Sequence, residues 1–366
     1  MKIGWIFPRN KKCGISYYSH AYIAKIRQHF AVEEFDAHEV LFLTPTIIDK
    51  INTCDCIHIQ YEPSFFMKNR FEMYSKLCRN IRRPIIVTLH EVYEQSPFDF
   101  PREEITGSFL IRALKLFRYD LAHPYQTAYR RHLKRHFFAQ KIVVHNQYQN
   151  RILKDFGIPA SSIRIIGQPI QNRPYTKPNL CRNRVLQLGS TGFVNPTYDF
   201  DLLFQTLDAL TIPWEFIWVG SAARAVHQET LQRLYKMIGR RNWEKKFIIT
   251  GWLSNYSRNK ILDSLDIYMA LFTTRSNSGS LADALSARRP IITTDIPLTR
   301  EINRNREVLR IVPSQPADIV MMIKKLTTDK REVSRIVRAQ CKMCEENSYD
   351  NIVQSLINTY REVLTS

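Results

Sequence analysis

Long hydrophobic runs are missing from this sequence of 366 residues. No apolar stretch approaches the roughly 18–20 residues that span a bilayer. The opening MKIGWIFPRNKKCG has an apolar run too short for the core of a signal peptide. The seven cysteines are an odd number at irregular positions, so they do not form a disulfide framework. We therefore expect a cytoplasmic protein with reduced thiols.

Several catalytic signatures are also missing. The sequence contains neither a GxGxxG turn, nor a P-loop, nor a GxSxG elbow. Cys341 and Cys344 form a single CxxC, which we interpret as two packed cysteines on a helix. His132 and His136 are four residues apart without an HExxH motif, so we interpret them as part of a basic helix face. Nothing in the sequence calls for a metal or another cofactor.

Acidic residues are scarce. Against 53 Lys and Arg there are 34 Asp and Glu, which gives a formal net charge of +19, although 44% apolar residues are ordinary for a globular protein. The segment Ile105–Lys141 has eight basic residues, one acidic residue and seven Phe and Tyr side chains. Such a charge attracts nucleic acid, a membrane surface or anionic small molecules.

The first half of the chain alternates short apolar runs with helical spacing, which predicts a doubly wound parallel sheet. The strands are expected at Ile3–Phe7, Glu39–Leu43, Cys56–Gln60, Ile85–Leu89 and Ile142–His145. The helices are expected at Ser16–Phe30, Phe65–Ile81, Ala128–Phe138 and Tyr148–Phe156.

The same alternation restarts after a segment with three prolines and no periodicity, Gln168–Arg184. Strands are expected at Arg184–Leu188, Glu215–Val219, Phe247–Thr250, Ile267–Leu271, Ile291–Thr293 and Val308–Val312. Helices are expected at Asp201–Leu210, Gln228–Ile238, Ser257–Ser264, Leu281–Ala287, Pro316–Leu326 and Asp350–Leu364. We therefore predict two facing domains with ligands bound in the cleft between them. The predicted domains are residues 1–170 with 346–366, and 185–345, joined by a linker over 171–184.

Three junctions between strand and loop suit a nucleotide diphosphate and a sugar. Lys11, Lys12 and Gly14 form a basic turn that opens a helix, as anion-binding turns do, although an ordinary turn fits equally. His90 ends a buried strand, and the preceding strand ends in Gln60-Tyr61-Glu62, which we expect to line the same cleft.

The segment Arg275–Pro290 is the most informative of the three. Its Ser278-Gly279-Ser280 reads as a loop and helix N-cap, with Asp283 in the first turn, which together would make an anion pocket. The alternative is that Ser280 only caps the helix and that Asp283 only complements the helix dipole.

Taken together, these motifs resemble the retaining glycosyltransferases of family 4, which have the GT-B fold of two facing Rossmann-like domains. The resemblance covers nearly the whole chain. It is carried by IGWIFP…CGISYYSHAY, IHIQYE, PIIVTLHE, AQKIVVHNQYQNRIL, LGSTGFVNPTYDFDLL, FIITGWLSNYSRNKILDSLDIYMALF and the terminal SYDNIVQSLINTYREVL.

The resemblance implies roles for individual residues. It places His90 at the donor sugar, Gly14 with Lys12 at the diphosphate, and Gly251 with Trp252 at the nucleobase. It also implies that Ser278, Gly279 and Ser280 hold phosphate oxygens and that Asp283 grips the ribose as the second acid of an E-x7-E motif.

The sequence departs from the family pattern at four positions. The first acid of the E-x7-E motif is replaced by Arg275, and the usual Arg and Lys at the diphosphate are replaced by Phe193 and Tyr198. Because guanidinium binds phosphate in bidentate fashion, we expect Arg275 to take over part of the clamping. Arg288 replaces a glycine, which we expect to change the surface at that helix end.

The function predicted in this way is retaining, metal-independent transfer of a hexose from a UDP- or GDP-sugar to a lipid-linked or cell-envelope glycan. The transfer is expected at the inner face of the cell membrane. The residues expected to bind anionic headgroups there are Arg130, Arg131, Lys134 and Arg135. The alternatives are an inactive GT-B protein that binds sugar nucleotide or a partner, and a single-stranded nucleic-acid binder. No recognised nucleic-acid module accompanies the charge, so we expect no nucleic-acid partner.

Overall fold

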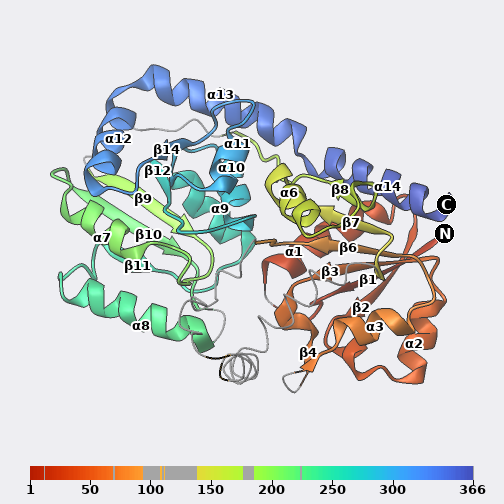
Figure 1. The fold of residues 1–366 in the computed structure, drawn as a ribbon. Coiled ribbons are helices and arrows are strands. Elements are labelled where there is room, and N and C mark those ends of the chain that lie inside the picture. Colours follow the sequence, from red (N-terminus) through yellow and green to blue (C-terminus); the bar gives the residue numbers. More distant parts are fainter. Residues whose placement is uncertain are drawn as a thin grey trace. The chain divides into compact units, whose positions relative to one another are not determined.

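The computed structural model describes residues 1–11, 13–68, 71–93, 108, 111, 138–175, 185–222 and 225–365. The chain divides into two compact units: the first comprises residues 1–167 and 349–366, and the second residues 168–348. Each unit contains a parallel six-stranded sheet with helices on both faces (Figure 1). The predicted α/β class with two doubly wound sheets is therefore confirmed.

The sheet of the first unit has the order β2-β1-β3-β6-β7-β8. Every residue of β3 and β6 is buried, because continuous apolar runs suit strands that are covered on both faces. The strands are β1 Lys2–Phe7, β2 Ala31–Asp36, β3 Cys56–Tyr61, β6 Ile85–Leu89, β7 Lys141–Val144 and β8 Ile163–Ile165. The helices are α1 Gly14–Ile26, α2 Pro45–Asn52, α3 Tyr74–Asn80, α6 Gln147–Asp155 and α14 Tyr349–Thr365. Shorter elements are η1 Glu39–Phe42, η2 Pro63–Phe66, β4 Met67–Lys68, β5 Phe71–Glu72 and η5 Ala160–Ser162.

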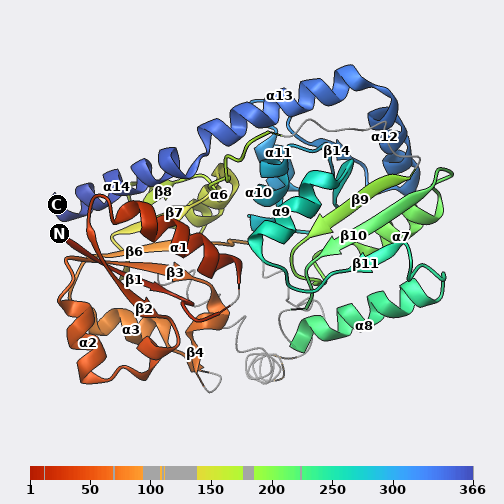
Figure 2. The same ribbon diagram turned by 180° about the vertical axis from the view of Figure 1, so that it is seen from behind.

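The last helix, α14, belongs to the first unit although it is far from it in sequence. It lies beside α1 in both ribbon views (Figures 1 and 2). Trp5, Tyr22 and Tyr360 are fully buried in the layer that these two helices form with the sheet. The opposite face of the sheet packs against α2, α3 and α6.

The sheet of the second unit has the order β11-β10-β9-β12-β13-β14. Its strands are β9 Leu186–Thr191, β10 Trp214–Val219, β11 Phe247–Ile249, β12 Ile267–Ala270, β13 Ile291–Thr294 and β14 Arg310–Val312. Its helices are α7 Phe200–Asp208, α8 Ala225–Gly239, α9 Asn255–Ser264, α10 Gly279–Ala287, α11 Pro297–Ile302, α12 Pro316–Thr328 and α13 Lys330–Glu346. All six strands predicted in this half exist, with ends shifted by up to three residues.

Two elements predicted in the first half are wrong. Glu39–Leu43 is not a strand, because Glu39–Phe42 forms the 3-10 helix η1. The second strand is instead Ala31–Asp36 at the sheet edge, where Glu33 pairs with Lys2 and Lys50. Because acidic side chains occupy its partly exposed positions, this strand lacks the continuous apolar run that is typical of buried strands.

The helix predicted over Phe65–Ile81 is also wrong. The chain instead forms η2, the antiparallel pair β4 and β5, and the seven-residue helix α3. Only Tyr74, Leu77 and Cys78 give the helical spacing that the sequence shows, and these residues are buried in α3. Ala128–Phe138, with His132 and His136, lies outside the described residues except for Phe138.

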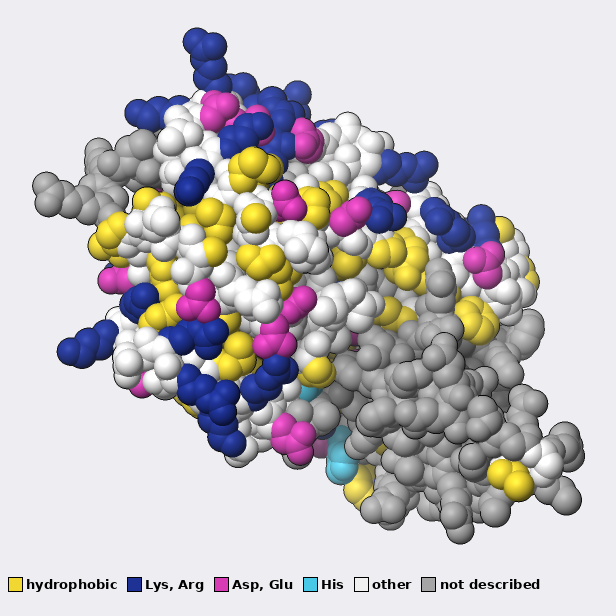
Figure 3. Space-filling view, turned by 60° about the vertical axis from the view of Figure 1, so that its left-hand side comes forward, with side chains coloured by type: hydrophobic (Ala, Val, Ile, Leu, Met, Phe, Trp, Pro, Cys, Tyr) yellow, Lys and Arg dark blue, Asp and Glu magenta, His cyan; other side chains and the backbone are white. Residues whose placement is uncertain are grey.

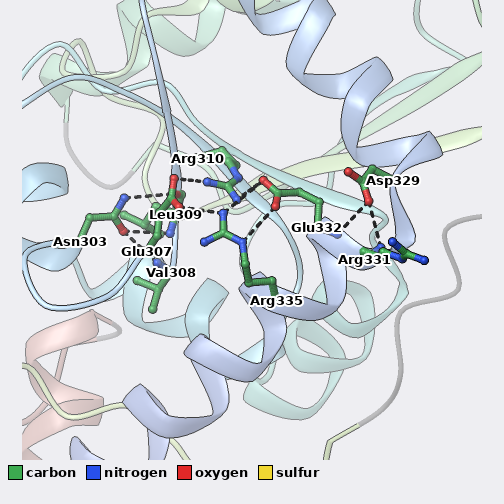
Figure 4. A network of polar contacts seen from close by, with 9 residues as sticks. All are labelled: Asn303, Glu307, Val308, Leu309, Arg310, Asp329, Arg331, Glu332 and Arg335. Atoms are coloured by element: carbon green, nitrogen blue, oxygen red, sulfur yellow. Dashed lines mark hydrogen bonds and ion pairs between the residues drawn. The ribbon is translucent and has the colours of Figure 1, made fainter.

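An ion-pair network ties β14 to α13 in the second unit (Figure 4). The guanidinium of Arg310 is buried and contacts the carboxylates of Glu307 and Glu332. Arg335 donates to Glu307 Oε2 at 2.8 Å and to Glu332 Oε2 at 3.1 Å. Burial alone would raise the pKa of the Glu307 carboxyl, but Arg335 and Arg310 lower it.

The second of the CxxC cysteines, Cys344, is buried on the same helix, α13, and its thiol donates to the Leu285 carbonyl at 3.4 Å.

Candidate functional site

Two glycines bring the ends of β9 and β10 against the start of α10. Gly192 has φ +115 and Gly220 has φ +143, a region that side chains rarely adopt. A Cβ added at Gly220 would lie 2.0 Å from the Gly192 carbonyl oxygen, and one added at Gly192 would lie 3.3 Å from Ser280 Cβ. The backbone therefore passes close to the amino end of α10, as it does where a loop approaches a ligand.

The first turn of α10 provides exposed hydrogen-bond donors. Ser278, rather than Ser280, is the N-cap: its side chain accepts from the Leu281 amide at 3.2 Å. Ser278 Oγ lies 3.0 Å from Ser280 Oγ, and no atom lies within 4 Å of a Cβ added at Gly279. An open helix start with two hydroxyl groups and the positive end of the helix dipole suits an anion.

Asp283 follows one turn later in α10 and is paired within the protein. Its Oδ1 lies 3.2 Å from Arg258 Nη2 on α9. Burial raises the pKa of the Asp283 carboxyl, while Arg258 and Arg173 act in the opposite direction. The acid that the resemblance assigns to the ribose is thus present and half-buried, with a cation beside it.

Arg275 lies on the loop between β12 and α10. Its guanidinium carbon is 5.6 Å from the centre of the Phe272 ring, a distance that permits a cation–π contact. The loop is anchored by Asn277, whose Nδ2 donates to Gln168 Oε1 at 2.9 Å. Arg275 precedes the N-cap residue Ser278 by three residues in the sequence.

An aromatic stack lies next to Gly192. The Phe193 and Trp252 rings are stacked with centroids 5.7 Å apart, and the His227 ring lies 6.3 Å from Phe193. Trp252 is 41% exposed, and it follows Gly251, which has φ +71. The partly exposed Trp252 ring therefore lies beside a residue that closely follows the end of β9.

The other two departures from the family pattern are explained by burial. Tyr198 is in the interior, where its hydroxyl donates to the Met269 carbonyl at 3.1 Å, so it offers nothing to a diphosphate. The expectation that Arg288 changes the protein surface is wrong, because this residue is 4% exposed. It ends α10 in the left-handed region at φ 52, and its guanidinium donates to the Arg173 carbonyl at 2.6 Å and to Asn172.

In the first unit the basic turn opens a helix as predicted, and this helix, α1, begins at Gly14 rather than at Ser16. No atom lies within 4 Å of a Cβ added there, and Ser16 Oγ donates to the Arg9 carbonyl at 3.3 Å across the turn. Lys11 extends over the Phe65 ring, with Nζ 5.2 Å from its centroid. Lys12 lies outside the described residues.

His90 directly follows β6 and is half-buried near α1. Its ring packs edge-on against Tyr18 of α1, with centroids 5.2 Å apart, and lies 5.6 Å from the His145 ring. Burial lowers the pKa of His90 well below its ordinary value, and His145 and His58 lower it further. The imidazole is therefore neutral near pH 7.

The expectation that Gln60 and Tyr61 line an open cleft is wrong. Gln60 is fully buried and Tyr61 is 3% exposed. Gln60 instead reaches His90 from the interior, and its Oε1 accepts from His90 Nε2 at 2.9 Å. His58 and Tyr360 extend this contact, and no motif in the sequence marks either of them. The sequence signal for the network is the presence of polar residues inside the apolar runs CIHIQY and IIVTLH.

The predicted membrane-docking residues Arg130, Arg131, Lys134 and Arg135 lie outside the described residues. Within the described ranges, no helix has the length and apolar character needed to cross a membrane. The same residues contain no group of three or more His, Cys, Asp or Glu side chains that could hold a metal ion.

Comparison with known proteins gives a consistent result. Residues 183–329 match the family model described as "Glycosyl transferases group 1". No match was found among curated proteins. HepE of Anabaena, solved with UDP and glucose, is similar at a TM-score of 0.72 and 15% identity, covering 99% of this chain and 100% of that one.

Two further solved structures are similar. Sucrose-phosphate synthase from Thermosynechococcus elongatus has a TM-score of 0.73 at 11% identity, with 100% of this chain and 99% of that one covered. TarM of S. aureus, solved as a mutant with Fondaparinux, alpha-GlcNAc-glycerol and UDP, has a TM-score of 0.64 at 15% identity, with 90% of this chain and 59% of that one covered. At these identities the likeness establishes the fold, which is GT-B.

Proposed function

We propose that the chain is a retaining glycosyltransferase that moves a hexose from a UDP- or GDP-sugar to a glycan acceptor. One observation carries the proposal. In the second unit, which contains all of the residues that match the group 1 model, the open start of α10 abuts the Gly192–Gly220 backbone at the ends of two parallel strands. This is the position where parallel α/β sheets bind ligands.

Sugar transfer requires stabilisation of the negative charge that develops on the departing diphosphate. We assign this task to the α10 amides of Gly279 and Ser280, to the guanidinium of Arg275, and to the Gly14 turn with Lys11 and Lys12. Trp252 would contact the nucleobase, and Asp283 would accept from the ribose hydroxyls. In this proposal no metal takes part.

His90 is assigned to the donor sugar. A neutral imidazole can accept a hydrogen bond from a sugar hydroxyl, so its role is to orient the sugar rather than to attack it. Retention of configuration is what the family resemblance implies, and no protein nucleophile is assigned.

The acceptor is proposed to be a lipid-linked or cell-envelope glycan at the cytoplasmic membrane face. The support is the net charge of +19 and the basic, aromatic composition of Ile105–Lys141. Among the described residues on the face drawn in Figure 3, basic and acidic side chains are interspersed. Co-sedimentation with anionic liposomes should weaken when Arg130, Arg131, Lys134 and Arg135 are neutralised, and unchanged co-sedimentation would contradict membrane docking.

The catalytic proposal is tested with a panel of UDP- and GDP-sugars. A true donor should raise the melting temperature by mass action and should slowly release its nucleotide diphosphate. Arg275→Ala should abolish the release, whereas Arg233→Ala on α8, whose side chain is 61% exposed and paired with Asp201, should leave it unchanged. Stabilisation by a donor without any release would favour the alternative of an inactive sugar-nucleotide-binding protein.

A further inference from the structure

A chain of hydrogen bonds runs through the interior of the first unit and ends at His90. The amide of Gln60, on β3, lies between two histidines and is fully buried. Its Oε1 is 2.9 Å from His90 Nε2, and its Nε2 is 3.2 Å from His58 Nε2. Both ends of a single amide are therefore used to connect the two rings.

The far end of the chain lies on the last helix. His58 Nδ1 is 2.5 Å from the hydroxyl oxygen of Tyr360 on α14, and His58 Nε2 is 2.7 Å from Thr88 Oγ1 on β6. His58, Thr88 and Tyr360 are at most 1% exposed. Three elements thus hold this network in place.

The amide atoms fix the direction of the hydrogen bonds. A carbonyl oxygen can only accept, so the contact with Gln60 Oε1 requires a hydrogen on His90 Nε2. The Gln60 NH2 group donates to His58 Nε2, so the hydrogen of His58 is on Nδ1 and points to Tyr360. A neutral imidazole carries one hydrogen, which leaves His90 Nδ1 as an acceptor.

The surroundings keep His90 neutral. The titratable groups around it include Tyr18 on α1, His58 on β3 and His145 after β7, and both histidines disfavour a positive charge on His90. His145 Nδ1 donates to the Ile166 carbonyl at 3.0 Å, which fixes that ring in the opposite tautomer. Burial lowers the pKa of His145 to about 4 and that of His58 to about 3.

We propose that Gln60 is a positioning residue, which holds His90 in the Nε2–H tautomer so that Nδ1 accepts a hydroxyl hydrogen of a neutral sugar. The role rests on the proposed function, in which His90 orients the donor sugar. It also specifies the sugar: a lone pair on Nδ1 attracts a hydroxyl group and repels a carboxylate, so a hexose should be preferred to a uronic acid.

The test uses two substitutions in the full-length protein. Gln60→Met keeps the side-chain volume but removes the acceptor, whereas Gln60→Glu keeps an acceptor at Oε1. Gln340→Met is the matched control, because Gln340 is also fully buried and its Nε2 donates to two carbonyls in the second unit. The tautomer of His90 is read from 15N-histidine NMR spectra, with the signals assigned by their loss in His90→Asn.

We expect His90 to carry its hydrogen on Nε2 in the wild type and in Gln60→Glu, and to populate both tautomers in Gln60→Met. With an identified donor, kcat/KM should fall about tenfold in Gln60→Met, the factor that the net free energy of one hydrogen bond provides. Gln340→Met should keep its kcat/KM at a similar loss of thermal stability. In Gln60→Glu the carboxylate raises the pKa of His90. As the pH is lowered, this variant should therefore lose activity at a higher pH than the wild type does.

Two results would overturn the inference: an Nδ1–H tautomer in the wild type, or an unchanged tautomer in Gln60→Met. The NMR measurement needs no substrate, so it still decides the role of Gln60 if no sugar nucleotide proves to be a donor. Failure to find a donor would contradict the proposed function but not the role of Gln60.

Discussion

The Asp283 carboxylate lies 3.2 Å from the Arg258 guanidinium, so the acid at the start of α10 is already paired with a cation on α9. The two side chains are 28% and 23% exposed, which leaves part of the carboxylate accessible. A ligand hydroxyl would therefore meet an oriented acceptor rather than a mobile one.

Asp283→Asn should weaken nucleotide binding. The substitution removes a charged acceptor for the ribose and leaves Arg258 without its partner. We expect about a tenfold increase in the Kd for UDP or GDP, because a hydrogen bond to a charged group contributes about 1.5–3 kcal/mol. Calorimetric titration measures this change. Asp295→Asn removes a carboxylate from an exposed Arg300 pair in the same unit and should leave the Kd unaltered; equal affinities for all three proteins would remove Asp283 from the site.

The first unit should lose stability in mild acid. Its buried His58 and His145 and its half-buried His90 all have a pKa below the ordinary value of 6.5, because loss of solvent disfavours the charged ring. Below pH 6.5 the unfolded chain binds protons that the folded unit does not, so stability is complete above pH 6.5 and falls as the pH decreases. Between pH 7.5 and 5.5 the loss should be about 1.4 kcal/mol per histidine.

Amide hydrogen exchange at the two pH values, corrected for the intrinsic exchange rates, measures this loss separately for each unit. His145→Gln should reduce the pH dependence of the first unit by about one third, since one of three such groups is removed. A pH dependence that is unchanged by this substitution would show that His145 is not held neutral.

The buried strands of the two sheets could be predicted from the sequence, because fully buried parallel strands have continuous apolar runs. All six strands of the second unit exist where this pattern is found. The edge strand β2 could not be found in this way, since Glu33 and Glu34 face Lys and Arg partners at the sheet edge. Its neighbour Glu39–Phe42 has the apolar content of a strand but forms a 3-10 helix.

Site residues could be predicted where the residue type indicates a local backbone feature such as a helix start. They could be predicted less well where the feature depends on contacts between segments that are distant in sequence. Ser278 and Gly14 mark the starts of helices, which local sequence shows. The burial of Arg288 and the link from Gln60 to Tyr360 depend on segments distant in sequence, so neither follows from local patterns.

The network in Figure 4 should matter more for stability than exposed ion pairs do. The Arg310 side chain is 6% exposed and contacts the carboxylates of Glu307 and Glu332. Substitution of Arg310 would leave both carboxylates without this cation. Arg310→Met should lower the free energy of unfolding of the second unit by about 3 kcal/mol, as removal of one partner of a buried ion pair does. Arg233→Met, at a pair whose side chains are 61% and 55% exposed, should cost at most about 1 kcal/mol. Urea denaturation compares the two, and equal losses would contradict the argument from burial.

The helix α14 should be required for the first unit to fold. Its Leu356 is 2% exposed in the layer shared with α1, so Leu356→Ala should cost about 2–5 kcal/mol through lost burial and the cavity left behind. Met321→Ala is the control in α12, because a side chain that is 64% exposed should change stability by no more than about 0.5 kcal/mol. In Leu356→Ala, hydrogen exchange should accelerate in β1 and β3 but not in β9 and β10, since α14 belongs to the first unit. Acceleration confined to the second unit would contradict this assignment.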